Sequence, residues 1–244
     1  MTINAKGMYY RELNEKIRAA VAAGETEITV DGVNGQRYIG DGVRGKATIT
    51  VNGVPGNDLA AFMDGPTLIV NANAQDGVAN TMNEGKIVIN GNAGDVLGYG
   101  MRGGKLYVKG DVGYRVGIHM KGYKTNIPVV IAGGTAGDFF GEYMAGGILM
   151  LLGIGREKDA PLVGDYLGTG MHGGVMYIRG EVDLANCGAE VGILELDEED
   201  NKNLELYLKE YCEDTGHNYD EIMKGKFVKL YPKSSRPYGR LYAY

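Results

Sequence analysis

Three segments of the sequence carry the glycine spacing with which many proteins bind dinucleotides. The pattern G-x-G-x-x-G occurs at Gly40–Gly45, Gly98–Gly103 and Gly168–Gly173. In a nucleotide-binding fold this pattern joins a strand to a helix whose N-terminus holds the pyrophosphate. Here a strand-like segment follows each match, so we interpret the glycines as chain corners. Residues Gly40–Thr48 also approach a P-loop, but Ala47 stands where the Mg²⁺-binding hydroxyl belongs.

Four aspartates share one position of a repeating pattern and could together hold a cation or act on a glycan. They are Asp76, Asp95, Asp138 and Asp165, and Tyr114 interrupts the series. Aspartate commonly caps its own turn, and unpaired carboxylates stacked in a column would repel one another. These aspartates are therefore predicted to be capped or exposed turn residues rather than a site.

The histidines and cysteines form no recognisable metal or nucleophile pattern. His119, His172 and His217 lie far apart, and the spacings H-E-x-x-H, H-x-x-E-H and paired C-x-x-C do not occur. We expect His119 and His172 to point outward from different repeats. Cys187 and Cys212 are predicted to be buried thiols. The sequence thus assigns no catalytic, cofactor-binding or metal-binding residue.

The elements that position these residues must accommodate an unusual amount of glycine. Glycine accounts for 41 of 244 residues, whereas average proteins contain about 7%. With 6 prolines and no three-residue period the chain is not collagen, and 44% apolar residues argue against disorder. The net charge of −6 argues against nucleic acid or an anionic membrane as partner. Two cysteines and no signal peptide predict a cytoplasmic protein.

A nineteen-residue repeat fills the middle of the chain. Consecutive units begin at Val54, Asn73 and Asn92, and two later steps contain inserts of five and eight residues. A weaker copy opens the array at Gly35. One methionine marks the register of each of six units. These methionines are Met63, Met82, Met101, Met120, Met144 and Met171.

Each unit ends in a short alternating apolar segment, which is typical of a β-strand with one buried face. The proposed inward pairs are Ile49/Val51, Leu68/Val70, Ile87/Ile89, Leu106/Val108, Val129/Ile131, Leu149/Leu151 and Met176/Ile178. A strand and a glycine corner in every unit predict an all-β fold, a single-stranded parallel β-helix of about seven coils. In such a stack like residues lie above one another, so methionine packs on methionine.

The flanking segments are predicted to cover the open ends of the solenoid. At the N-terminus we expect a helix over Tyr10–Ala23 and a strand over Glu27–Val30. At the C-terminus we expect an acidic helix over Glu198–Asp214, a short helix capped by Asn218, and a strand over Phe227–Pro232. The predicted division is an N-terminal cap (1–34), a β-helix (35–181) and a C-terminal α/β extension (182–244).

The repeats resemble the C-terminal β-helix domain, or GXGXG domain, of the large subunit of glutamate synthase. The resemblance is carried by Gly98–Val108, Gly110–Gly122, Ala136–Gly153 with its EYMAGG segment, and Gly168–Gly180. The closing SRPYGRLYAY is similar to the end of the free-standing form of that domain. The resemblance covers the chain from about residue 8 onward and implies a right-handed helix.

In that family the β-helix is a scaffold that packs against a glutaminase domain and a flavin and iron–sulfur synthase domain. The resemblance therefore implies a non-catalytic scaffold subunit of a glutamate synthase-like complex in nitrogen assimilation. The expected partners are glutaminase and FMN synthase subunits, with FMN and the iron–sulfur cluster bound by those partners. No nucleic acid or membrane is expected, and a homo-oligomer remains open.

Three alternatives stay open from the sequence. The same β-helix is similar to an accessory subunit of formylmethanofuran dehydrogenase, a molybdenum or tungsten enzyme, although EYMAGG and the C-terminal tail favour glutamate synthase. An independent carbohydrate-active β-helix could use the aspartate column with Arg102, Arg115 and Arg179. A left-handed acyltransferase fits poorly, because its coil normally has eighteen residues.

Partner binding needs exposed aromatic or arginine anchors, and the tail offers several. These candidates are Arg236, Tyr238, Arg240, Tyr242 and Tyr244. Phe139 and Phe140 are further candidates. The equally weighted alternative is that the tail only folds back over the solenoid.

Overall fold

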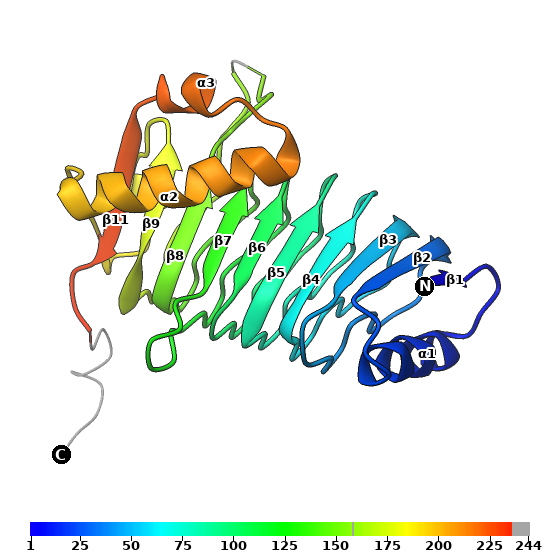
Figure 1. Ribbon diagram of the computed structural model, residues 1–244. Helices are drawn as coiled ribbons and strands as arrows, with labels where there is room; N and C mark the ends of the chain where they lie inside the picture. Colours follow the sequence, from blue (N-terminus) through cyan, green and yellow to red (C-terminus); the bar gives the residue numbers. More distant parts are fainter. Residues whose placement is uncertain (158, 236–244) are drawn as a thin grey trace.

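The chain folds into a parallel β-solenoid built on one long sheet (Figure 1). The computed structural model describes residues 1–157 and 159–235. The strands are β1 (Thr2–Asn4), β2 (Glu27–Asn34), β3 (Thr48–Val54), β4 (Asp64–Val70), β5 (Glu84–Ile89), β6 (Lys105–Val108), β7 (Val129–Ala132), β8 (Ala145–Leu151), β9 (Gly173–Arg179), β10 (Val191–Leu194) and β11 (Phe227–Pro232). The helices are α1 (Tyr10–Ala22), α2 (Glu198–Thr215) and α3 (Tyr219–Met223), with a 3₁₀ turn at Leu184–Asn186.

Strands β1 to β9 lie side by side in chain order and are all parallel. For β3 to β9 this is the arrangement that the repeat predicts. The solenoid has about six turns, slightly fewer than the seven predicted coils. The seven predicted units end in the seven strands β3 to β9, and the chain makes a full turn from one of these strands to the next only six times.

The inner face of the sheet forms the main core of the solenoid. Ile49, Leu68 and Ile87 stand in register on successive strands and are fully buried. The six repeat methionines belong to the same core, and none has exposed surface. Because a single coil cannot bury its own inner face, this core exists only in the stack.

The predicted inward pair of β7 was wrong by one residue. Leu106 and Val108 of β6 stand beside Val130 and Ala132, which lie in the inner core. Val129 and Ile131 face the other way. A five-residue insert precedes β7 and all four residues of the strand are buried, so alternation does not reveal which face is inside.

The aspartate column connects neighbouring coils. The Oδ1 atom of Asp76 accepts a hydrogen bond from the backbone N–H of Asp95 (2.9 Å), and Asp95 accepts from Tyr114 (2.8 Å). Asp138 accepts in the same way from Asp165 (2.9 Å). Asp76 and Asp165 are exposed in turns, as predicted, but the Oδ1 atoms of Asp76, Asp95 and Asp138 cap the backbone of the next coil rather than their own turn.

Both ends of the solenoid are extended by the flanking segments, close to the predicted bounds. At the N-terminal end β2 pairs with β3, and β1, which was not predicted, pairs with β2. Helix α1 buries Leu13 and Ile17 against the same core. At the other end β11 runs antiparallel to β9, and β10 forms the outer edge.

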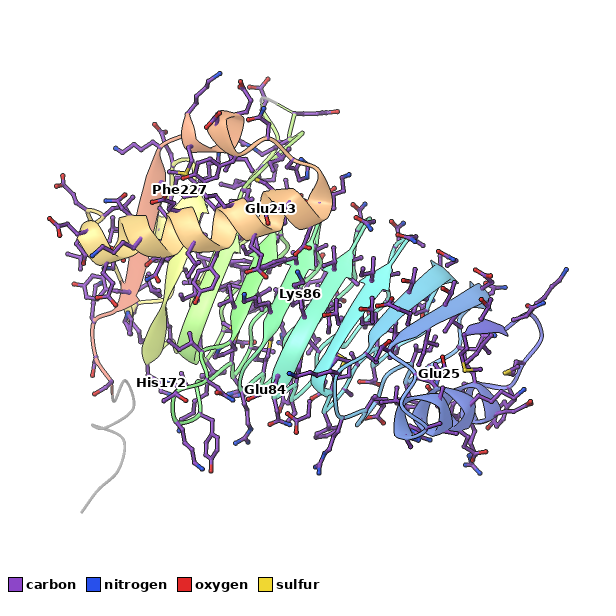
Figure 2. The ribbon with its side chains drawn as sticks, viewed as in Figure 1. Glu25, Glu84, Lys86, His172, Glu213 and Phe227 are labelled. Carbon is purple, nitrogen blue, oxygen red and sulfur yellow. The ribbon has the colours of Figure 1, made fainter. Side chains whose placement is uncertain are left out.

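Helix α2 lies across the outer face of the sheet and creates a second core (Figure 1). Leu204, Leu208 and Tyr211 of α2 pack on outward residues of β5 to β9, including Tyr107 and Tyr177. Figure 2 shows Lys86 on the sheet surface beside α2, where its ammonium pairs with Asp214 of the helix at 2.6 Å.

The N-terminus of α2 is fixed by a capping box between Asp197 and Asp200. Asp200 also accepts hydrogen bonds from Tyr177 of β9 (2.6 Å) and Lys229 of β11 (2.7 Å). These contacts join the helix to the end of the sheet. Within the described residues no helix combines the length and apolarity needed to cross a membrane.

Candidate partner-binding surface

A short segment before each of the strands β3 to β9, which we call the corner segment, has left-handed backbone at three alternating positions. In one coil these are Phe139, Gly141 and Tyr143, with φ of 60°, 74° and 50°. The predicted corner role of the G-x-G-x-x-G segments is confirmed, because strands β3, β6 and β9 follow them. Glycine adopts such angles at little cost, whereas other residues are strained there.

Hydrogen bonding between coils explains the left-handed positions. The N–H groups of Phe139 and Tyr143 donate to Asp165 (2.9 Å) and Thr169 (2.8 Å) of the next coil. The N–H of Gly141 donates the opposite way, to Val116 of the preceding coil (2.8 Å). The alternating handedness thus turns successive peptide groups toward opposite neighbours.

In the C-terminal coils, bulky rings occupy or adjoin these positions and form what we call the ring ladder. Its members are Tyr99, His119, Phe139, Tyr143 and Tyr166. His119 lies face to face with Tyr143 (centroids 5.3 Å apart, planes at 9°) and edge-on to Tyr99 (5.8 Å, 83°). Phe139 stacks on Tyr166 (4.9 Å, 11°). Tyr99 and Tyr166 are 40% and 56% exposed, so the ladder presents rings to the outside.

An arginine and a buried acid lie within the ladder. The guanidinium of Arg115 lies 5.0 Å from the ring centroid of Phe139, and its Nε is 3.3 Å from Oε2 of Glu142. The Glu142 side chain is only 10% exposed, and Oε2 makes no hydrogen bond of good geometry among the described residues. Its interaction with Arg115 is therefore an ion pair without a directed hydrogen bond, so it depends on Arg115 remaining in place.

Exposed rings and arginine are the residue types that dominate binding energy at protein interfaces. Rings held by strained backbone also cost stability, and such strain concentrates at functional sites. Left-handed rings occur in N-terminal coils too, at Tyr38 and Phe62. Tyr38 contacts Tyr10 of α1, however, and among the described residues Phe62 stacks on no other ring. Among corner segments, the C-terminal ones therefore make the better binding surface.

Other residues that the sequence analysis considered as site candidates have structural roles. His172 Nδ1 lies 3.0 Å from the Gly170 carbonyl, and His217 stacks on Tyr211 (5.7 Å, 14°). Arg179 donates to the Ile222 carbonyl (2.8 Å) and holds α3. Within the described residues no three His, Cys, Asp or Glu side chains gather as metal ligands.

The two thiols differ from each other. Cys212 is buried as predicted, but Cys187 is only half-buried, because it lies in the irregular chain beyond β9. Burial raises the pKa of both thiols, and the nearby Asp183 carboxylate adds to the effect at Cys187.

Of the predicted partner anchors, Phe139 belongs to the ring ladder and Phe140 lies in the main core. The tail candidates lie outside the described residues. These are Arg236, Tyr238, Arg240, Tyr242 and Tyr244.

The remaining ladder rings were not predicted from the sequence. A signal was present, since His119 and Tyr143 each precede a repeat methionine in consecutive units.

Comparison with known proteins places the chain in a family. The model of the family described as "GXGXG motif" matches residues 12–233. A protein of Methanocaldococcus jannaschii, described as "Uncharacterized protein MJ1350", is 46% identical over 250 residues, covering 99% of this chain and 96% of that protein. The family match agrees with the resemblance to the glutamate synthase β-helix that the repeats carry. The chain belongs to the GXGXG motif family.

Proposed function

We propose that the chain is a non-catalytic scaffold subunit of a multi-subunit, glutamate synthase-like complex in the cytoplasm. In this complex a separate glutaminase subunit releases ammonia, and a separate synthase subunit holds FMN and an iron–sulfur cluster. Family membership supports the proposal, because the resemblance to glutamate synthase implies a scaffold that packs against both catalytic domains.

The observation that carries the proposal is the ring ladder on a regular rod. Stacked coils are joined by backbone hydrogen bonds at every corner, for example from Phe139 to Asp165, so the rings keep a fixed spacing along the rod. A rigid row of aromatic anchors loses little entropy on binding, which suits a surface that holds two subunits in register.

The test is recovery of the complex from the cells in which the gene occurs. An affinity tag placed at residue 1 leaves the ring ladder unchanged, and mass spectrometry identifies what co-purifies. We expect a glutaminase and a flavoprotein with FMN and iron–sulfur absorbance. A stable chain recovered without partners would contradict the proposal.

The same experiment distinguishes the alternatives. Recovery of molybdenum or tungsten enzyme subunits would assign the chain to the formylmethanofuran dehydrogenase side. Truncation after Lys233 then tests the tail. Lost partner recovery at an unchanged melting temperature identifies binding anchors, whereas a lowered melting temperature with partners retained indicates a covering role.

A further inference from the structure

Two exposed cations lie directly above one another beside the ring ladder. Arg102 and Lys121 each follow a repeat methionine directly, and both are exposed to solvent. The N–H of Arg102 donates to the Met82 carbonyl (2.8 Å), and the N–H of Lys121 donates to Met101 (3.0 Å). This shared pattern places the two residues at equivalent positions of adjacent coils, about 4.8 Å apart along the axis of the stack. We call them the basic pair.

At the other end of the rod, the equivalent positions of two adjacent coils carry opposite charges. There Arg44 stands beside Asp64, and the opposite charges pair at 3.9 Å. Like charges in direct register repel one another. Among the described residues neither Arg102 nor Lys121 forms an ion pair, although the chain as a whole carries a net charge of −6.

The neighbours of the basic pair do not neutralise it. Asn83 precedes it in the column and Ala145 follows it, as their hydrogen bonds to Met63 and Met120 show. Glu84, labelled in Figure 2 at the edge where the strands begin, instead accepts a hydrogen bond from the Asn126 amide (3.2 Å).

The basic pair adjoins the rings in the chain itself. Tyr99 lies three residues before Arg102, and His119 lies two residues before Lys121, with buried methionines between. Two rings in edge-to-face contact thus lie within three residues of the two unpaired cations, and we treat the four residues as one surface over two coils.

We infer that this surface binds an acidic, aromatic segment of a partner protein. Carboxylates of the segment pair with Arg102 and Lys121, while its apolar groups contact the ring ladder. Charge complementarity supplies the argument, since opposite charges brought to the pair remove its internal repulsion. The inference deepens the proposed scaffold function, on which it rests, by stating the partner's chemistry.

Nucleic acid is a less suitable occupant of the same surface. In the part of the chain that the structure describes, only two stacked cations are unpaired at this surface, since Arg115 is engaged by Glu142. A protein that binds along a phosphate backbone needs a longer positively charged groove. A neutral glycan would use the rings but would leave the basic pair without a counter-charge.

The test uses the purified full chain and a short peptide that alternates glutamate and tyrosine, carrying a neutral fluorescent label. Its counterpart replaces each glutamate by glutamine. The variant is Arg102→Glu with Lys121→Glu, and the matched control is Arg44→Glu with Lys46→Glu, an equal charge change at the far end of the rod. Circular dichroism and the melting temperature show that each variant is folded.

We expect the acidic peptide to bind at least about tenfold more tightly than its amide counterpart, with an affinity that falls as salt rises. The Arg102/Lys121 variant should lose about tenfold in affinity, and the control should stay within about twofold. The inference would be overturned if both peptides bound equally well, or if the Arg102→Glu/Lys121→Glu variant bound the acidic peptide as tightly as the unchanged chain. It would also be overturned if single-stranded DNA bound more tightly than the peptide and lost this binding in the same variant. The peptide assay contains none of the proposed partner subunits. Failure of this inference can therefore be distinguished from failure of the proposed function, which would appear as failure to recover a glutaminase.

Discussion

The imidazole of His119 and the phenol ring of Tyr143 lie 5.3 Å apart with an angle of 9° between their planes. Both residues have left-handed backbone, with φ of 55° and 50°. Glycine fills the same corner position in the preceding and the following coil, at Gly100 and Gly170. The chain thus accepts strain at two neighbouring positions to hold two rings face to face on its surface.

Ring removal at a left-handed position should separate binding from stability. Tyr166 has φ of 62°, so Tyr166→Gly relieves backbone strain while it removes the stack on Phe139. The gain and the loss are each about 1 kcal/mol, so the free energy of unfolding should change by less than about 1 kcal/mol. Recovery of partner subunits should nevertheless fall strongly. Denaturant unfolding and co-purification measure the two effects.

Phe62→Gly is the matched control for this prediction. Phe62 is also left-handed (φ 57°) and 52% exposed, but it lies outside the ring ladder. Its removal should leave partner recovery unchanged. Equal loss of partners in both variants would mean that the ladder has no special role.

Several glycines are required because an oxygen of the preceding coil occupies the place of a Cβ. A Cβ on Gly94 would lie 2.1 Å from Oδ1 of Asp76. Gly94→Ala should therefore destabilise the fold by at least about 2 kcal/mol through overpacking. Gly42→Ala, where no atom lies within 4 Å, should cost only the left-handed backbone penalty of about 1–2 kcal/mol.

A double-mutant cycle checks the cause of the Gly94 effect. Adding Asp76→Ala removes the obstructing oxygen, so the double variant should be more stable than the sum of the single changes predicts. Strictly additive effects would show that some other contact makes Gly94 necessary.

The ion pair of Arg115 and Glu142 should contribute measurably to stability. Arg115→Gln leaves a buried carboxylate without its cation, which we expect to cost about 1–2 kcal/mol, because the half-exposed arginine is partly screened by water. In a Glu142→Gln background the same change should cost less than about 0.5 kcal/mol. Chemical denaturation of the four proteins gives the coupling energy, and a coupling of zero would contradict the pairing.

Acid should loosen the attachment of α2. The backbone N–H of Asp200 and then the ammonium of Lys229 lower the pKa of Asp197 below its ordinary value. A lowered pKa contributes stability that is complete above about pH 4 and is lost as the pH falls through the lowered pKa. The melting temperature should therefore drop in this acidic range, and the drop should be smaller in Asp197→Asn. Parallel acid profiles of the two proteins would argue against a role for this carboxylate.

A whole coil should be easier to delete than part of one. Deletion of residues 73–91 would bring β4 against β6 with Leu68 beside Leu106, because both align with Ile87 in the intact sheet. Deletion of residues 73–82 would leave β5 out of register with its neighbours. We expect the first variant to unfold cooperatively and the second to aggregate, as judged by circular dichroism and light scattering.

The repeat predicted the parallel sheet and the buried methionines, because these depend on spacing along the chain. The flanking segments predicted α1 and α2, but α2 lies across the outer face of the sheet and not over the open end of the solenoid. Alternation did not predict the inner residues of β7, since the solenoid core buries one face of that strand and α2 buries the other. The coverage of β7 by a helix some seventy residues later is a tertiary fact that local pattern cannot contain.

The aspartate column and the ring ladder show the same limit at the site. The shared position of Asp76 and Asp95 was visible, but the direction of each side chain toward the next coil was not. His119 and Tyr143 could have been aligned through their methionines, whereas their stacking depends on the left-handed backbone of both corners.

Hydroxyl-radical footprinting of the recovered complex tests the central claim most directly. In the isolated chain Tyr99, Tyr166, Tyr9 and Phe62 are all exposed and should be oxidised. In the complex, we predict that Tyr99 and Tyr166 become protected while Tyr9 and Phe62 stay reactive. Unchanged oxidation of Tyr99 and Tyr166 in a complex that contains the catalytic subunits would contradict the ring ladder as the docking surface.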